Sequence, residues 1–386
     1  PLSSSSAASD VYKRQLGNKG VALQHVSYAD GKLNVQKAAY TGTNAMYGEQ
    51  KLSATLETDS TVYVVEADII FADVIIDSEE DFRVTRLSGD YNQHDYSDKL
   101  LRKHPDYNET VPGYIILKND ITCIKYDTQQ EDRSYGIAGQ YSDGVNPMNM
   151  KSCFIDGVFD GRNHVIKNAK VGGSNGGLFA SIYRTTIKNV TFINAELATA
   201  AGRAASTGFL ATSCGNSTIE NVTVYAKIGD GLNTDNNNPG SMLISKISHD
   251  LPTTVKNCLV VVESQPNKQN NASMLVSRMD GNAQKYVTIK NCICVNMANV
   301  DSANLVRAIY NEESYTQMLK KENVHTFLGW NADLTNVDVD AFTGSNIVFI
   351  GESNLPVSKS VMTDAYKDDL AKYYPQGTDF TTENDA

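Results

Sequence analysis

Ile187-Lys188-Asn189-Val190 is the first full copy of a phrase that recurs along this chain. The phrase returns, after 32, 36 and 34 residues, as Ile219-Glu220-Asn221-Val222, Val255-Lys256-Asn257-Cys258 and Ile289-Lys290-Asn291-Cys292. A second phrase precedes each copy: Gly177-Leu178-Phe179, Gly208-Phe209-Leu210, Ser241-Met242-Leu243 and Ser273-Met274-Leu275. A nearly fixed period in this range indicates structural units that stack on one another.

The aligned copies give columns, and each column has its own chemistry. Three columns are apolar or carry thiols and are expected to point into a shared core: Ile187, Ile219, Val255, Ile289; Val190, Val222, Cys258, Cys292; and Phe192, Val224, Val260, Cys294. The charged column is expected to face water: Lys188, Glu220, Lys256 and Lys290. Alternation of period two, together with the β-branched residues, predicts strands rather than helices.

An asparagine stands in the third position of every copy: Asn189, Asn221, Asn257 and Asn291. Asparagine tolerates bent backbone conformations and can hydrogen-bond nearby main chain. At a strand spacing of about 4.8 Å, stacked side-chain amides can also bond one another. The partial copy Val165-Ile166-Lys167-Asn168 is expected to open this ladder. We therefore predict the coils of a right-handed parallel β-helix, with these five asparagines in a structural rather than a ligand-binding role.

Several stretches resemble the GLUG-repeat family of bacterial surface proteins. Gly176-Gly177-Leu178-Phe179 followed by Thr186-Ile187-Lys188-Asn189-Val190 is similar to the repeat, and residues 157–166 resemble its first coil. Residues 76–82 and 113–121 resemble the capping segment that comes before it. The resemblance covers roughly residues 75 to 310, and the later copies lose the double glycine. It implies a secreted or wall-attached protein of a host-associated bacterium, with adhesion or glycan contact, and it assigns no catalytic residue.

The region before the repeats is expected to hold three parts. Residues 1–15 include Asp10-Val11-Tyr12-Lys13-Arg14-Gln15, which looks like a translated sequencing-library tag, so a signal peptide is expected to be lost from a truncated gene. Residues 16–75 predict a small immunoglobulin-like β domain with strands at 21–26, 32–35, 51–56 and 61–67. Residues 76–150 predict a capping segment, with a helix after Ser78 and a polar insert at 89–108.

The β-helix itself is expected over residues 151–312, and residues 313–386 are expected to form a C-terminal cap and tail. Residues 313–322 predict a closing helix, and residues 361–374 predict an amphipathic one. Helical caps suit the end of a stack, because an open end offers unpaired strand edges. The only tryptophan, Trp330, is expected to plug the last coil rather than to bind sugar.

Charge and cysteine content exclude several classes of protein. A formal charge of −11 over 386 residues argues against nucleic-acid binding. No apolar stretch approaches the roughly 20 residues that a membrane span requires. The six cysteines include no Cys-x-x-Cys pair that would indicate zinc. Cys258 and Cys292 share a column, where thiols behave as small buried hydrophobes and a disulfide would be poorly posed.

The loops between the copies are the expected location of any binding function. Insertions in repeat proteins collect on one face, and that face is often the binding face. The Asn-rich loop offers four oxygen-bearing candidates for Ca²⁺ or ligand contact: Asp230, Asn233, Asp235 and Asn237. Their spacing is loose and ends without a bidentate Glu, so a solvated loop is favoured and no cofactor is expected.

Asp156 and Asp160, followed by His164, are the candidates for catalysis. Glycosidases need two facing carboxyl groups, yet each of these aspartates precedes a glycine, as in a turn. We therefore expect a monomeric, non-catalytic, extracellular recognition or adhesion module that contacts a glycan or a host or cell-surface protein. A polysaccharide lyase or glycoside hydrolase, and a purely structural stalk, stay open as alternatives.

Overall fold

The computed structural model describes residues 13–18, 26–29, 32–35, 48–57, 62–72, 74–79, 81, 102–103, 110–111, 114–123, 153–155, 157–171, 177–197, 207–229, 240–247, 252–266, 272–279, 286–301, 304–310, 312–315, 317–330 and 334–380. Only the backbone is described before residue 70 and at residues 71, 102–103, 110–111, 153–155 and 180–181.

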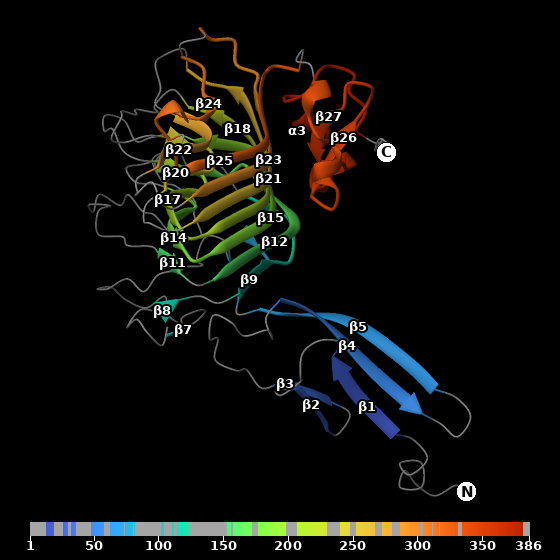
Figure 1. Cartoon of the computed structure of the whole chain (residues 1–386). Coiled ribbons are helices and arrows are strands. Elements are labelled where there is room, and N and C mark those ends of the chain that lie inside the picture. Colours follow the sequence, from blue (N-terminus) through green and yellow to red (C-terminus); the bar gives the residue numbers. More distant parts are fainter. Residues whose placement is uncertain are drawn as a thin grey trace, which may run out of the picture.

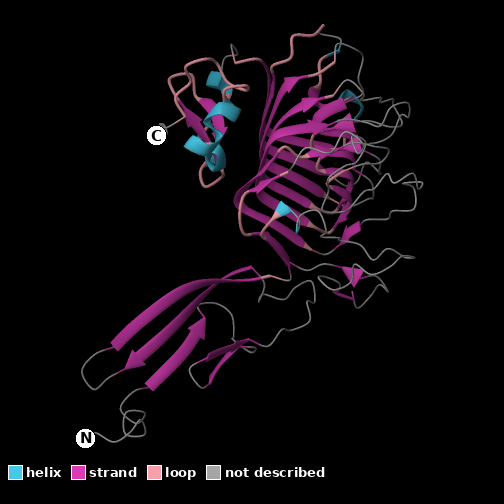
Figure 2. Ribbon diagram, turned by 180° about the vertical axis from the view of Figure 1, so that it is seen from behind, coloured by secondary structure: helices cyan, strands magenta, loops and turns pink. Residues whose placement is uncertain are grey.

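The chain forms an all-β parallel β-solenoid of the right-handed type, with very few helices (Figures 1 and 2). The larger sheet has ten strands: β6 (Val74–Ile76), β9 (Tyr114–Leu117), β10 (Ile121–Thr122), β12 (Val158–Lys167), β13 (Lys170–Val171), β15 (Thr186–Leu197), β18 (Thr218–Ile228), β21 (Thr253–Ser264), β23 (Val287–Asn296) and β25 (Leu319–Leu328). The smaller sheet has eight: β11 (Cys153–Ile155), β14 (Phe179–Tyr183), β16 (Thr207–Gly208), β17 (Ala211–Gly215), β19 (Gly240–Ser241), β20 (Ile244–Ile247), β22 (Ala272–Met279) and β24 (Arg307–Ile309).

The apolar columns form the core between the two sheets, as the sequence predicted. Ile187 lies opposite Ile219, Ile219 opposite Val255, and Val255 opposite Ile289, all in parallel register. The side chains of all four are fully buried. Each buried side chain of this size contributes about 1.5–3 kcal/mol relative to exposure. The repeat period therefore fixes the register, because a slip by one residue would turn every core side chain outward.

Each long strand of the larger sheet bends at its asparagine. Asn189, Asn221, Asn257 and Asn291 have φ angles of 55°, 52°, 53° and 50°. These values lie in the left-handed region, which asparagine adopts more readily than other residues with a side chain. The bend divides the outward surface of each strand into one face before the asparagine and a second face after it.

The C-terminal end of the stack is not closed by the helix predicted at residues 313–322. A single 3₁₀ turn, η5 (Glu312–Tyr315), leads into β25, which pairs in parallel with β23. β25 is a fifth copy of the phrase, Lys321-Glu322-Asn323-Val324, in which Lys321 stands opposite Ile289 in the inward column. Its ammonium pairs with Glu312. The last coil thus places a charged pair where the core ends, and charge on an edge strand discourages further strand pairing.

The segment of residues 334–380, here called the C-terminal segment, lies along the side of the stack rather than over its end (Figure 1). It contains the hairpin β26 (Ile347–Ile350) and β27 (Leu355–Ser358) and short helical turns: η6 (Leu334–Asn336), η7 (Asp340–Phe342), η8 (Lys359–Val361), η9 (Asp364–Tyr366) and α3 (Lys367–Leu370). The continuous helix predicted at 361–374 is therefore replaced by short turns. Trp330 does not plug the last coil: its ring stacks on Tyr374 at 4.8 Å, and its Nε1 donates to the Tyr373 carbonyl oxygen at 2.5 Å.

The C-terminal segment covers outward side chains that follow the asparagine bends. One such column runs through Tyr225, Val261, Val295 and Phe327, and these residues share a buried apolar cluster with the segment. A strand with both faces buried reads as a continuous apolar run. The run Cys258-Leu259-Val260-Val261-Val262 in β21 has that pattern.

Outside the solenoid and the C-terminal segment, the described strands form an antiparallel three-stranded sheet and two hairpins. The sheet joins β1 (Lys13–Asn18), β4 (Gly48–Glu57) and β5 (Val62–Phe71), and the hairpins join β2 (Val26–Ala29) to β3 (Lys32–Val35) and β7 (Arg102–Lys103) to β8 (Thr110–Val111). A full immunoglobulin-like sandwich is not seen among the described residues. At the predicted helix start, the Asp81 amide donates to Ser78 Oγ at 3.1 Å, as in a capping box. Most of the predicted capping segment lies outside the described residues.

Candidate functional site

The asparagine side chains of successive coils are hydrogen-bonded to one another in two runs. Asn221 Nδ2 donates to Asn189 Oδ1 at 3.0 Å, and Asn291 Nδ2 donates to Asn257 Oδ1 at 3.2 Å. Asn323 of the fifth copy adds a bond of 3.2 Å to Asn291 Oδ1. Between the runs, Asn221 Oδ1 is buried without a hydrogen bond among the described residues. These amides hold the bend of each strand, so their polar atoms are largely occupied within the stack.

Asp160 lies at the foot of this ladder and is almost completely buried. Asn189 Nδ2 and the Arg162 amide donate to its Oδ1 at 3.0 and 2.9 Å, and the Tyr114 hydroxyl donates to its Oδ2 at 2.9 Å. The Lys188 ammonium pairs with Oδ2 at 3.2 Å. Four groups of the protein bind this carboxylate, which indicates a structural role for Asp160. Asp156, its predicted partner in catalysis, lies outside the described residues.

Asn168 stands in a different column from the one that the sequence suggested. Lys167 pairs with Ile193, which places Asn168 one residue later beside Asn194 rather than beneath Asn189. Asn194 Nδ2 lies 3.5 Å from Asn168 Oδ1, and Asn168 Nδ2 lies 3.5 Å from the Cys123 carbonyl oxygen. Both asparagines have positive φ angles, 63° and 53°. The first two coils therefore carry a second bend, which later copies do not repeat in their sequence.

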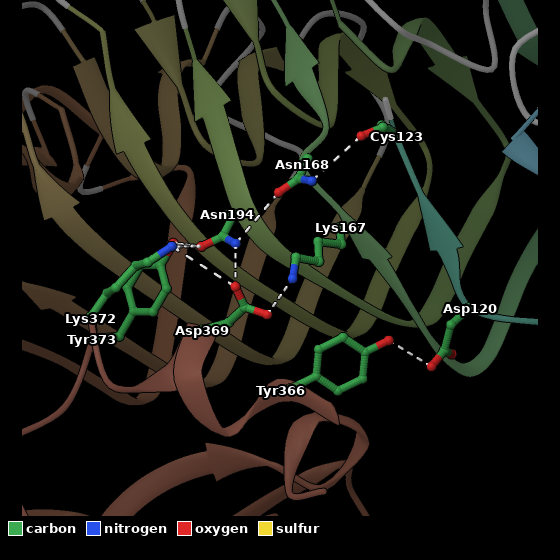
Figure 3. Close-up of polar contacts among 9 residues, drawn as sticks. All are labelled: Asp120, Cys123, Lys167, Asn168, Asn194, Tyr366, Asp369, Lys372 and Tyr373. Atoms are coloured by element: carbon green, nitrogen blue, oxygen red, sulfur yellow. Dashed lines mark hydrogen bonds and ion pairs between the residues drawn. The ribbon is translucent and has the colours of Figure 1, made fainter. Parts of the chain in front are cut away.

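Asp369 of α3 joins the C-terminal segment to this second bend (Figure 3). Its Oδ2 accepts from Lys167 Nζ at 2.6 Å, and its Oδ1 accepts from Asn194 Nδ2 at 2.6 Å. Lys372 Nζ and the Tyr373 hydroxyl in turn donate to Asn194 Oδ1 at 3.2 and 3.3 Å. A buried carboxylate with a charged and a neutral donor is strongly held, because removing either partner would leave it unsatisfied.

Asp120 and His164 form a second contact with the C-terminal segment. Asp120 Oδ1 lies 3.0 Å from His164 Nδ1 and accepts from the Val165 amide at 2.9 Å, while the Tyr366 hydroxyl donates to Oδ2 at 2.7 Å. Burial alone would raise the pKa of Asp120, but the bonds from His164, Tyr366 and Val165 outweigh burial and hold it below its usual value. His164, a predicted catalytic candidate, is thus engaged in orienting a carboxylate at this junction.

A pocket of about 600 Å³ opens within the C-terminal segment itself. Residues 362–364, 367 and 377–380 line it. Its volume lies in the range typical of small-molecule sites. No pattern in the sequence indicated this pocket, because the residues that line it come from separate turns.

The cysteines of the core are thiols within the described part of the chain. Cys258 and Cys292 lie opposite each other in β21 and β23, and their Sγ atoms donate to the carbonyl oxygens of Lys256 and Lys290 at 3.2 and 3.3 Å. Burial, followed by the contact with Cys292, raises the pKa of Cys258 well above its ordinary value. A thiol held protonated in this way is a poor nucleophile and a poor metal ligand.

The loop candidates Asp230, Asn233, Asp235 and Asn237 all lie outside the described residues. In the described part of the chain, no group of three or more His, Cys, Asp or Glu side chains is arranged to hold a metal ion. Within the same residues, no helix is long and apolar enough to cross a membrane.

No protein-family model matches this chain, and no curated protein is significantly similar to it. Among solved structures, the chain is similar to the crystal structure of a protein described as a "putative immunoglobulin A1 protease" from Bacteroides ovatus. The match covers 74% of this chain and 92% of that one, with 16% sequence identity and a TM-score of 0.42. A likeness at that level carries no argument about activity, so the function has to be argued from the residues.

Proposed function

We propose that this chain is a non-catalytic, extracellular recognition or adhesion module of a GLUG-like bacterial surface protein, which contacts a glycan or a host or cell-surface protein. The observation that carries the proposal is the environment of Asp160. This residue, the described member of the candidate catalytic pair, is 4% exposed and held by four protein groups. A general acid or nucleophile has to reach substrate.

The rest of the solenoid supports the same proposal. The repeated asparagines are bonded within the stack, and His164 is bonded to Asp120. The stack serves as a rigid support, and binding is proposed to fall to irregular surface elements, which repeat proteins commonly use for contact.

The test is binding of the full chain to an array of host glycans, mucins and matrix proteins, with the heat-denatured chain as the control for adhesive background. We expect saturable binding to at least one immobilised ligand by the folded chain alone. Absence of binding to every ligand would reject the recognition proposal in favour of a stalk. Release of new reducing ends or unsaturated uronates from polysaccharides would instead establish the lyase or hydrolase alternative.

A further inference from the structure

The pocket in the C-terminal segment has an apolar floor and a polar rim. Phe380 is 9% exposed and packs edge-on against Tyr374 with ring centroids 5.3 Å apart, which fixes the position of the floor. Met362, partly buried beside the apolar cluster, extends this floor. A floor of this kind can cover one apolar face of a ligand, while the rim groups select its polar edge.

The rim carries both hydrogen-bond donors and acceptors. Asp364 and Asp379 supply carboxylates, Lys367 supplies an ammonium group, and Thr363 and Thr378 supply hydroxyls. The Thr378 hydroxyl donates its proton to the Pro375 carbonyl oxygen at 2.7 Å, so toward a ligand it can act only as an acceptor. Hydrogen bonds from ligand hydroxyls to carboxylates are charge-assisted and therefore stronger than neutral ones.

The balance of charge restricts the class of ligand. The rim sets the Asp364 carboxylate beside the Lys367 ammonium group, in a chain whose formal charge is −11. The Asp364 carboxylate and the negative chain would disfavour an anionic sugar, and the Lys367 ammonium would oppose a compact cation. A neutral polyhydroxyl ligand with one apolar C–H face satisfies both the rim and the floor.

We propose that this pocket binds the terminal residue of a neutral glycan, through Asp364, Lys367 and Thr363 on its rim and Phe380 and Met362 beneath it. This inference rests on the proposed recognition function and names a binding site and ligand class for it. The pocket lies in the same turns that fasten the C-terminal segment to the stack: Tyr366 bonds Asp120, and Asp369 bonds Lys167. The rigid stack thereby holds the site in place.

The experiment is ligand-observed saturation-transfer NMR on the full chain, with the methyl glycosides of glucose, galactose, mannose and N-acetylglucosamine as probes and N-acetylneuraminic acid as the anionic comparison. The variants are Asp364→Ala and Lys367→Ala on the rim. Asp368→Ala is the matched control, because Asp368 is an exposed carboxylate next to Lys367 in α3 and is not among the residues that line the pocket. Thermal unfolding of each variant shows that it is folded.

We expect at least one neutral glycoside to bind, N-acetylneuraminic acid to bind more weakly, and Asp364→Ala to raise the dissociation constant about tenfold or more while Asp368→Ala leaves it unchanged. Equal affinity in wild type and both rim variants would overturn the pocket assignment, while the recognition function itself would stand with its site elsewhere. Saturation of none of the neutral probes would also overturn it, and the array of glycans, mucins and proteins would then decide the recognition function separately.

Discussion

The two outward faces of the long strands have opposite character although they belong to the same strands. Before the asparagine bend, charged side chains of successive coils form ion pairs at 2.7–3.2 Å: Lys188–Asp160, Lys256–Glu220 and Lys290–Glu322. After the bend, Tyr225, Val261 and Val295 are fully buried beneath the C-terminal segment. The asparagine is therefore more than a turn residue, because it separates a charged face, most of whose side chains reach water, from an apolar face covered by another segment of the same chain.

The largest loss of stability is expected from placing a charge on the face that the C-terminal segment covers. Val261→Asp would bury a carboxylate among Tyr225, Val295 and the C-terminal segment, at a cost of about 4 kcal/mol or more. Thr254→Asp is the matched control, because Thr254 lies on the water-facing part of the same strand and should change stability by less than about 0.5 kcal/mol. Urea unfolding of both variants measures the difference; similar losses would mean that the two faces are energetically alike.

A smaller effect is expected from changing the bend itself. Asn291→Ala places an alanine at a φ of 50° and removes the amide bonds to Asn257, Asn323 and the Ala341 carbonyl oxygen. The cost is expected to be about 2–4 kcal/mol. Asn291→Gly keeps the backbone conformation and should cost roughly half as much, since only the side-chain bonds are lost. Equal unfolding free energies for the two variants would show that the left-handed conformation costs nothing here.

The contacts of Asp120 with His164 and Tyr366 should make the free energy of unfolding depend on pH. The folded state holds the pKa of Asp120 below its unfolded value of about 3.9, so this contribution is present above that value and is lost as the pH falls through the lower folded pKa. Unfolding midpoints measured from pH 7 to pH 2.5 should differ between wild type and Asp120→Asn above pH 4, and the difference should shrink below it. A difference that stays constant to pH 2.5 would contradict the assignment.

The smallest change in stability is expected from removing an ion pair of the charged face that precedes the asparagine bend. The Lys256–Glu220 pair, at 2.9 Å, has side chains 37% and 27% exposed. A double-mutant cycle with Lys256→Ala and Glu220→Ala should give a coupling free energy below about 1 kcal/mol, which falls further in high salt. A coupling that exceeds this value and resists salt would show that the charged face, too, stabilises the stack substantially.

The fifth copy of the repeat shows where sequence reasoning about the stack failed. The sequence predicts a closing helix at residues 313–322, whereas Lys321 lies in β25, a strand whose first repeat column is charged instead of apolar. A lysine there breaks the pattern of a core strand, yet it suits the last coil, where the column opens to solvent and meets Glu312. The asparagine at 323, 32 residues after Asn291, was the signal that could have identified this strand.

The junction residues gave almost no signal in the sequence. Asp369 meets Lys167 from 202 positions away, and Tyr366 meets Asp120 from 246. Neither pair belongs to a repeat, so periodicity could not find them. The apolar run in β21 was the one clue that both faces of that strand are buried, although it could not say what covers the outer one.

The sequence by itself determined the coils, their register and the inward columns of this protein, because these depend on a short phrase repeated at close intervals and on the period of two within a strand. Tertiary structure alone decided which outward columns are covered and where Asn168 and Trp330 lie. It also decided that residues 334–380 run beside the stack rather than over its end. Those outcomes depend on contacts outside the repeat pattern, between residues from 26 to 246 positions apart, which no local pattern encodes.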